Sequence, residues 1–324
     1  MERGLPGAFL ERLVSFGAQS LDCDREGVNA THADMFVATS PADELREVFR
    51  RVVAEGLRWD DVEIVSTNVD TYGVSLDVLC QQTGVGGTMT RGIPLARTRF
   101  GRILERCFTW LGDGLPADVL REALEAGEIG ANVEVQPVLL ARKLRKLHIG
   151  WGRGRYTDAV DHLNEPDAES HLRRYDDESE DEFRVRAAFE ATCADALRTV
   201  LQELLASTPP VPERGDDTVI RSSVSKLATA TLGWISLAYV HGPAESQTRE
   251  RVCNRLRDLV EVDDAETTFG AALATLRDAL SDMRAWPLVT SEAKPWTASG
   301  GMVHLTDVAH AGTTGRARTF LVGL

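Results

Sequence analysis

Apolar and polar positions alternate between strand and helix patterns over residues 34–112. Short apolar runs at residues 35–38 and 62–66 are typical of buried strands. Ser40, followed by a proline and two acids, marks a helix start, and apolar positions recur at helical spacing from there to Gly56. The order of strand, helix and strand predicts a parallel sheet that is covered by helices on both faces.

Further helices in this part follow from the same spacing. Residues 72–79 give a helical pattern after the second strand. Thr98 is a candidate N-cap for a helix whose apolar positions describe a core-facing surface. A proline-containing segment at 115–118 opens another short helix.

Long helical patterns dominate residues 131–295, which we interpret as an all-helical insertion. Two polar stretches interrupt them, an acidic one at 158–181 and a proline-rich one at 207–212, and both are typical of loops or linkers. The helical patterns cover residues 137–147, 182–205, 219–239, 248–260 and 267–283.

The pattern returns to strands near the end of the sequence. Residues 302–306 and 319–324 are apolar runs that flank a glycine-containing turn at 311–316. An α/β sheet that is interrupted by helices and then resumed predicts three segments. These are residues 1–130, the first part of the α/β domain, residues 131–295, the helical insertion, and residues 296–324, the return to the sheet.

The formal net charge of −14 at pH 7 argues against a protein that binds nucleic acid over its whole surface, because phosphates need a positive field. A local basic face is compatible with this charge. One hypothesis for the acid excess is adaptation to a cytoplasm of high salt.

Several other features narrow the class of protein. The five cysteines are far apart and form no CxxC pair, which favours buried reduced thiols over disulfides or a zinc site. The histidines include no HExxH motif, so metal catalysis has no support. No apolar run is long enough to span a membrane, and the first residues lack the apolar core of a secretory signal. We therefore predict a cytoplasmic protein without a metal site or a membrane partner.

Three stretches carry a resemblance to a known family. Residues 38–47 and 60–65 are similar to the family's entry strand, a helix with an early acidic pair, and the next strand. Residues 91–102 look like a GIPL…T..GR run before a long helix, and residues 303–324 resemble the helicase motif V region. Together they resemble the C-terminal RecA-like domain of superfamily 1 DNA helicases of the UvrD, PcrA and Rep type, and more closely the helicase-like region of AddB- and RecB-type PD-(D/E)XK helicase–nucleases. The resemblance implies a RecA-like α/β fold interrupted by a 2B-like helical insertion.

The sequence departs from this family where a nucleotide would bind. Residues 66–73 contain no arginine, although these helicases carry one there that approaches the nucleotide phosphates. The turn at 311–315 differs from the usual Ala-Lys-Gly-Leu-Glu, and no P-loop pattern GxxxxGK(S/T) is present. The resemblance therefore implies no ATP hydrolysis by this chain alone, with ATP and Mg²⁺ involved only if a P-loop half is supplied elsewhere. We also expect the natural fold to continue beyond Leu324.

Basic and hydroxyl residues in three places are candidates for DNA contact. The motif V-like turn could offer hydroxyls and a cation to a phosphate, although its glycines equally suit a structural turn. A cluster of arginines at a helix start, and a basic stretch interleaved with aromatics, suit phosphate binding and base stacking, or equally a solvated cationic face. The acidic stretch 158–181 could instead bind the basic helix in the free protein. The candidates are Arg91, Arg99, Arg102, Arg142, Lys143, Arg145, Lys146, Trp151, Thr313, Thr314 and Arg316.

No catalytic residue is predicted. Residues 292–294 have the acid–lysine spacing of a PD-(D/E)XK nuclease, but a proline follows them and no aspartate lies on a plausible preceding strand. A GxSxG nucleophile elbow is also absent.

We expect a non-catalytic domain that binds single-stranded or end-containing DNA and acts as a scaffold in a helicase–nuclease for DNA end processing and repair. Its partner would be a helicase or nuclease domain or subunit. Two alternatives stay open. The chain could be the second half of an active ATP-dependent DNA translocase whose P-loop half lies elsewhere, or a stand-alone interaction protein without DNA binding.

Overall fold

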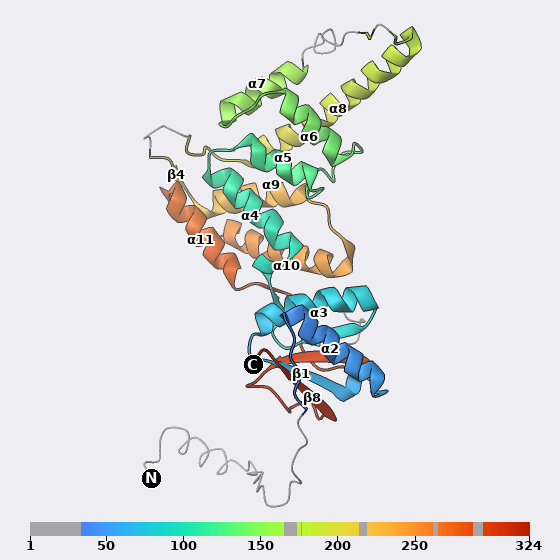
Figure 1. Ribbon diagram of the computed structural model, residues 1–324. Helices are drawn as coiled ribbons and strands as arrows, with labels where there is room; N and C mark the ends of the chain where they lie inside the picture. Colours follow the sequence, from blue (N-terminus) through green and yellow to red (C-terminus); the bar gives the residue numbers. More distant parts are fainter. Residues whose placement is uncertain (1–33, 165–173, 176, 214–218, 262–264, 288–293) are drawn as a thin grey trace, which may run out of the picture. The chain divides into compact units, whose positions relative to one another are not determined.

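The structure is a computed structural model that describes residues 34–164, 174–175, 177–213, 219–261, 265–287 and 294–324. The chain divides after Ala38, and every helix and strand below belongs to the second unit, Thr39–Leu324 (Figure 1). Among the described residues, no helix combines the length and the apolar character needed to cross a lipid bilayer.

A four-stranded parallel sheet confirms the predicted α/β class. Its strands, in spatial order, are β2 (Gly86–Met89), β7 (Met302–Asp307), β1 (Val62–Ser66) and β8 (Arg318–Val322). The first two strands of the sequence therefore pair with strands more than two hundred residues later. Because β7 lies between β1 and β2, the sheet cannot form until the segment that contains β7 has come together with the segment that contains β1 and β2.

Two helices, α2 (Pro41–Ala54) and α3 (Val69–Thr83), pack against each other and on the sheet, side by side in Figure 1. The predicted N-cap of α2 is confirmed, because the Ser40 hydroxyl accepts a hydrogen bond from the backbone amide of Asp43 at 3.2 Å. Gly56 follows α2 in the left-handed region, with φ of 66°, where glycine carries no steric penalty. Helix α2 buries Leu45, Val48, Phe49 and Val52 of its predicted apolar face, and packs against α3 and β8, whereas Val53, also predicted on that face, is 69% exposed.

Most of the remaining helices share one hydrophobic cluster that runs from Leu95 to Leu280, with Trp110 and Trp234 fully buried in it. The predicted cap of the first of these helices is confirmed, since Thr98 accepts a hydrogen bond from the amide of Gly101 at 3.0 Å. The helices are α4 (Arg99–Gly112), α5 (Ala117–Glu125), α6 (Pro137–Lys146), α7 (Arg153–Asn164), α8 (Glu180–Ser207), α9 (Val224–Ser236), α10 (Gly242–Glu261) and α11 (Phe269–Ser281).

The stretch 131–295 is not entirely helical, contrary to the prediction. Two short antiparallel pairs involve it: β4 (Arg221–Ser222) with β5 (Thr267–Thr268), and β6 (Arg284–Ala285) with β3 (Ile93–Pro94). Two-residue strands leave no periodic signal in a sequence, so the pattern could not reveal them.

Two further predictions are wrong. Residues 35–38 form no strand, and Met35 and Val37 are 92% and 97% exposed, because a short apolar run forms a strand only where a neighbouring strand pairs with it. The start of the predicted loop 158–181 is helical, as part of α7. Tyr156 and Leu163 are buried there, and the acids between them hid this apolar spacing. Residues 165–173 and 176 of that stretch lie outside the described residues.

Candidate nucleic-acid interface

The two faces of the sheet are distinguished by what crosses them. Helix α3 crosses from β1 to β2, and its Cys80 sulfur lies 2.9 Å from the position that a Cβ on Gly87 would take. Gly87 pairs with Val303, so these two residues share the face that α3 covers. Successive residues of a strand point to opposite faces. Thr88, His304 and Glu63, which pair across the three strands one position later, therefore point to the other face. The connection 308–317, which contains no helix, lies on that face, where Gly312 and Thr314 bind Glu63.

The carboxyl ends of β1 and β7 are the position in this sheet where ligands bind in open α/β folds. The connection that leaves β1 passes over one face of the sheet, and the one that leaves β7 passes over the other. Such a switch of direction between adjacent strands is the usual ligand-binding edge of a parallel sheet. The residues at this edge are Thr67 and Asn68 after β1, and Asp307 and His310 at the end of β7.

Charges at this edge are already paired. Asp307 Oδ2 lies 2.7 Å from Arg91 Nε in an ion pair without hydrogen-bond geometry, and the other carboxylate oxygen of Asp307 lies 2.6 Å from His310 Nδ1. Although burial alone would raise the pKa of Asp307, its contact with His310 and the charge of Arg91 lower it below the ordinary value. Arg91, a predicted DNA contact, is 55% exposed and offers its remaining N–H groups to solvent.

The connection 308–317 is held by a buried glutamate. Glu63 is 1% exposed and accepts hydrogen bonds from the Gly312 amide at 2.9 Å and the Thr314 hydroxyl at 2.8 Å. Thr313, in contrast, is exposed, and its hydroxyl donates to the carbonyl of His310 at 2.8 Å. Of the two predicted threonines, Thr313 therefore faces outward, whereas Thr314 anchors the turn.

Arg316 fixes the end of the same connection. Its guanidinium donates to four backbone carbonyls, at distances of 2.6 to 3.0 Å, from Trp59, Val62, Ser299 and Met302. Burial lowers the pKa of Arg316 below its ordinary value, while nearby acids act in the opposite direction. This set of partners gives Arg316 a structural role, because charge-assisted bonds to buried carbonyls are strong and hard to exchange for a phosphate.

A buried polar row crosses the sheet beside Glu63, and the sequence did not suggest it. His304 is 3% exposed, with Nδ1 2.8 Å from the Thr88 hydroxyl and Nε2 3.2 Å from the Thr90 hydroxyl. Burial, followed by the positive charge of Arg316, lowers the pKa of His304 to about 4. The histidine is therefore neutral near pH 7. The signal in the sequence was a glutamate, Glu63, and a histidine, His304, each inside an apolar strand pattern. The sequence did not predict that these two strands pair with each other.

The arginines at the start of α4 differ from each other. Arg99 donates to the carbonyls of Tyr239 and Gly127, both at 3.0 Å, and to Glu245 at 2.9 Å. It thus ties α4 to the segments before α6 and α10. Arg102 is exposed on α4 and is the member of this pair that a phosphate could reach.

The basic face of α6 carries the largest group of predicted contacts. Arg142 is exposed, Lys143 and Lys146 contact Glu190 at 3.1 and 3.4 Å, and Arg145 contacts Glu125 at 3.0 Å. Ion pairs at a surface contribute only about 0–1 kcal/mol, so phosphates could compete for these cations. Trp151, which follows α6, is 46% exposed.

The predicted residues thus lie in three groups: the connection 308–317 with Arg91, the start of α4, and the face of α6 with Trp151. No three His, Cys, Asp or Glu side chains in the described ranges gather closely enough to hold a metal ion. Compared with models of known protein families and with curated proteins, the chain matches none of them.

Proposed function

We propose that this chain is a non-catalytic, helicase-like domain that binds single-stranded or end-containing DNA and serves as a scaffold in a helicase–nuclease. The observation that carries the proposal is the motif V-like segment itself. It leaves β7 at the ligand-binding edge of the sheet, is held by hydrogen bonds to Glu63 of β1, and returns as β8. A long, mainly helical stretch separates β2 from β7, which supports a RecA-like domain with a 2B-like insertion.

The face of α6 is the best-placed surface for the DNA backbone. Arg142, Arg145 and Lys146 are exposed, at spacings of three and four residues that place them on one side of the helix. The exposed indole of Trp151 adds a surface on which a base can stack. Arg99 and Arg316 are left out of this surface, because their hydrogen bonds hold the protein together.

The test is binding of a fluorescently labelled single-stranded oligonucleotide, followed by anisotropy as a function of salt. Reversing two charges, R142E with K146E, should weaken binding and make the slope of log K against log salt shallower by about 1.4, or about 0.7 for each lost phosphate contact.

The matched control is R255E with R257E, which makes the same charge change on the exposed surface of α10. Equal binding by the α6 variant and the control would contradict the proposed surface. Failure of the unmodified chain to bind at low salt would contradict DNA binding altogether.

A further inference from the structure

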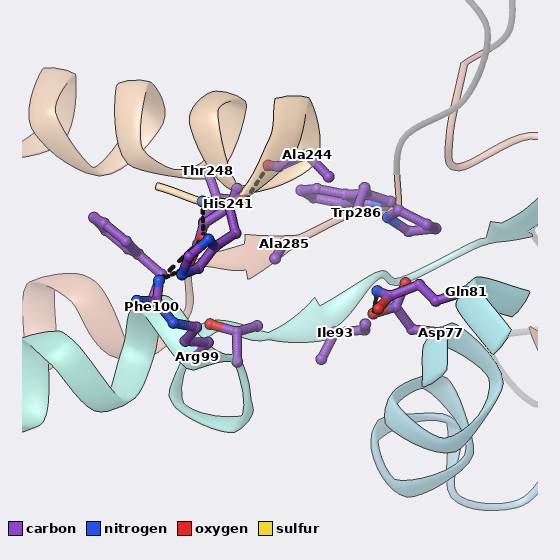
Figure 2. A pocket seen from close by; sticks show the side chains of 13 residues that line it. Asp77, Gln81, Ile93, Arg99, Phe100, His241, Ala244, Thr248, Ala285 and Trp286 are labelled. Carbon is purple, nitrogen blue, oxygen red and sulfur yellow. Dashed lines mark hydrogen bonds and ion pairs between the residues drawn. The ribbon is translucent and has the colours of Figure 1, made fainter. Parts of the chain in front are cut away.

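A pocket of about 240 Å³ lies where α3, β3, α4, α10 and β6 meet (Figure 2). Much of its wall is apolar, with Ile93, Phe100, Ala244, Ala285 and Trp286 among the lining side chains. None of the DNA candidates except Arg99 lines it, so the pocket is separate from the proposed nucleic-acid surface.

Most polar groups around this pocket have partners within the protein. Arg99 pairs with Glu245 at 2.9 Å, and the Glu245 carboxylate also accepts from the amide of His241. The hydroxyls of Thr98 and Thr248 donate to backbone carbonyls at 2.7 and 3.0 Å. A ligand would therefore gain little from these groups.

The exceptions are the Trp286 indole, whose buried Nε1 has no hydrogen-bond partner among the described residues, and Asp77. Its Oδ2 accepts one hydrogen bond, from Gln81 Nε2 at 2.8 Å. Within the described ranges, no cationic side chain lies within ion-pair distance of it. Figure 2 shows Asp77 and Gln81 at the end of the pocket away from Arg99, which is already committed to Glu245.

Burial raises the pKa of Asp77, which means that its negative charge is held at an energetic disadvantage. A carboxylate in an apolar wall destabilises a protein unless a cation or several donors meet it. Ionisable groups whose charge lacks a partner within the protein are typical of functional sites, where a ligand can supply that partner. At such sites a protein keeps side chains that reduce its stability.

A second cavity of about 370 Å³ on α10 shows the opposite polarity. It shares Ala244, Thr248 and Trp286 with the first, but there Arg251 lies over the Trp286 ring at 4.4 Å from its centroid. Trp286 thus lines both cavities, beside Arg251 in the second and together with Asp77 in the first. The negative charge of Asp77 in the first cavity and the positive charge of Arg251 in the second favour binding of a positively charged ligand in the first.

We propose that the Asp77 pocket binds an organic cation, a guanidinium or ammonium group on a hydrocarbon stem. The cation meets the free oxygen of Asp77, and the stem lies along Ile93 and Phe100. A nucleotide fits less well, because it would bring phosphate toward Asp77 and Glu245. The same cation could come from a free small molecule or from a basic side chain of another protein, and the inference does not rest on DNA binding.

Isothermal titration of the full chain distinguishes these sources. Butylguanidinium represents a free cation, N-acetyl-arginine N-methylamide represents a protein side chain, and guanosine represents a base. We expect both cations to bind and guanosine not to bind. Binding by the arginine amide alone would assign the source to a protein side chain, whereas equal binding by butylguanidinium would assign it to the cation itself.

The variant D77N should weaken cation binding about tenfold to a hundredfold, as expected for loss of a charge-assisted hydrogen bond. The control D278N removes an exposed aspartate from α11 and should bind like the parent chain. A second variant, A244F, leaves Asp77 intact but places a large side chain in the pocket, and should weaken cation binding at least as much as D77N does. Absence of cation binding to the parent chain, or tighter binding of guanosine, would overturn the proposal.

Discussion

Glu63, which is 1% exposed, and Asp77, which is half-buried, are acidic side chains that differ in how many hydrogen bonds their carboxylates accept. Glu63, at the centre of the sheet, accepts hydrogen bonds from the Gly312 amide and the Thr314 hydroxyl, at 2.9 and 2.8 Å. Asp77, on α3, has one amide partner in Gln81. The Glu63 carboxylate is part of a hydrogen-bond network within the protein, whereas the Asp77 carboxylate keeps an oxygen available for a further partner.

This difference separates a polar group that serves the fold from one that is open to a ligand. The Glu63 network joins segments far apart in sequence and fixes the connection that crosses the sheet, so we expect its loss to destabilise the fold. The open carboxylate of Asp77 holds nothing together, so we expect its loss to affect binding and to leave the fold intact or more stable. The two sites therefore predict effects of opposite sign for similar substitutions.

The largest effect is expected from Glu63→Leu. The substitution keeps an apolar strand position but leaves the Gly312 amide and the Thr314 hydroxyl without their acceptor. At about 2 kcal/mol for each bond to a charged group, the free energy of unfolding should fall by about 4 kcal/mol. Urea unfolding measures this loss, and hydrogen exchange at Gly312 should accelerate in parallel.

Glu55→Leu provides the control for this prediction, since Glu55 contacts Arg318 at 3.4 Å across an exposed surface. Its effect should stay within about 1 kcal/mol. If both variants lost the same stability, the network around Glu63 would be no stronger than a surface ion pair.

Local signals predicted much of the fold correctly. Ser40 and Thr98 cap their helices as expected, because an N-cap depends only on the next few residues. The apolar run at 62–66 is a fully buried strand. The error at 35–38 arose where an apolar run lacks a partner strand, which composition alone cannot reveal.

The candidate site was predictable only in part, for a physical reason. Arg316 was visible in the sequence as a cation in a turn, but its carbonyl partners come from segments that only the folded sheet brings together. The Glu63–His304 pairing likewise depends on the register between distant strands. The sequence therefore indicated which side chains carry charge, but not whether each charge is bound by partners within the protein or is accessible to a ligand.

A smaller effect, of about 3 kcal/mol, is expected from the pH dependence of His304. Its pKa is lowered from 6.5 to about 4 in the folded protein, mainly by burial. The unfolded chain therefore takes up a proton first as the pH falls. The stability associated with neutral His304 is fully present above pH 6.5 and is lost progressively between pH 6.5 and about 4.

Thermal unfolding of the parent chain and of H304N across this pH range isolates the contribution of this histidine. The variant should lose less stability on acidification, because it removes one group that binds a proton on unfolding. H148N, at an exposed histidine after α6, serves as the matched control and should behave as the parent chain does. Identical pH profiles for H304N and the parent chain would show that burial of His304 does not oppose its protonation.

The smallest effect, and the one of opposite sign, is expected from Asp77→Asn in the absence of ligand. Because burial raises the pKa of Asp77, its charged form is disfavoured in the folded protein at pH 7, and a neutral amide of the same shape removes that penalty. We expect a gain of about 0.5–1 kcal/mol in the free energy of unfolding, within the range of typical stabilising substitutions. The gain should disappear at pH values low enough to protonate the parent carboxyl in both states. Urea unfolding at pH 7 and at pH 3 measures both quantities, and a loss of stability at pH 7 would show that Asp77, like Glu63, serves the fold.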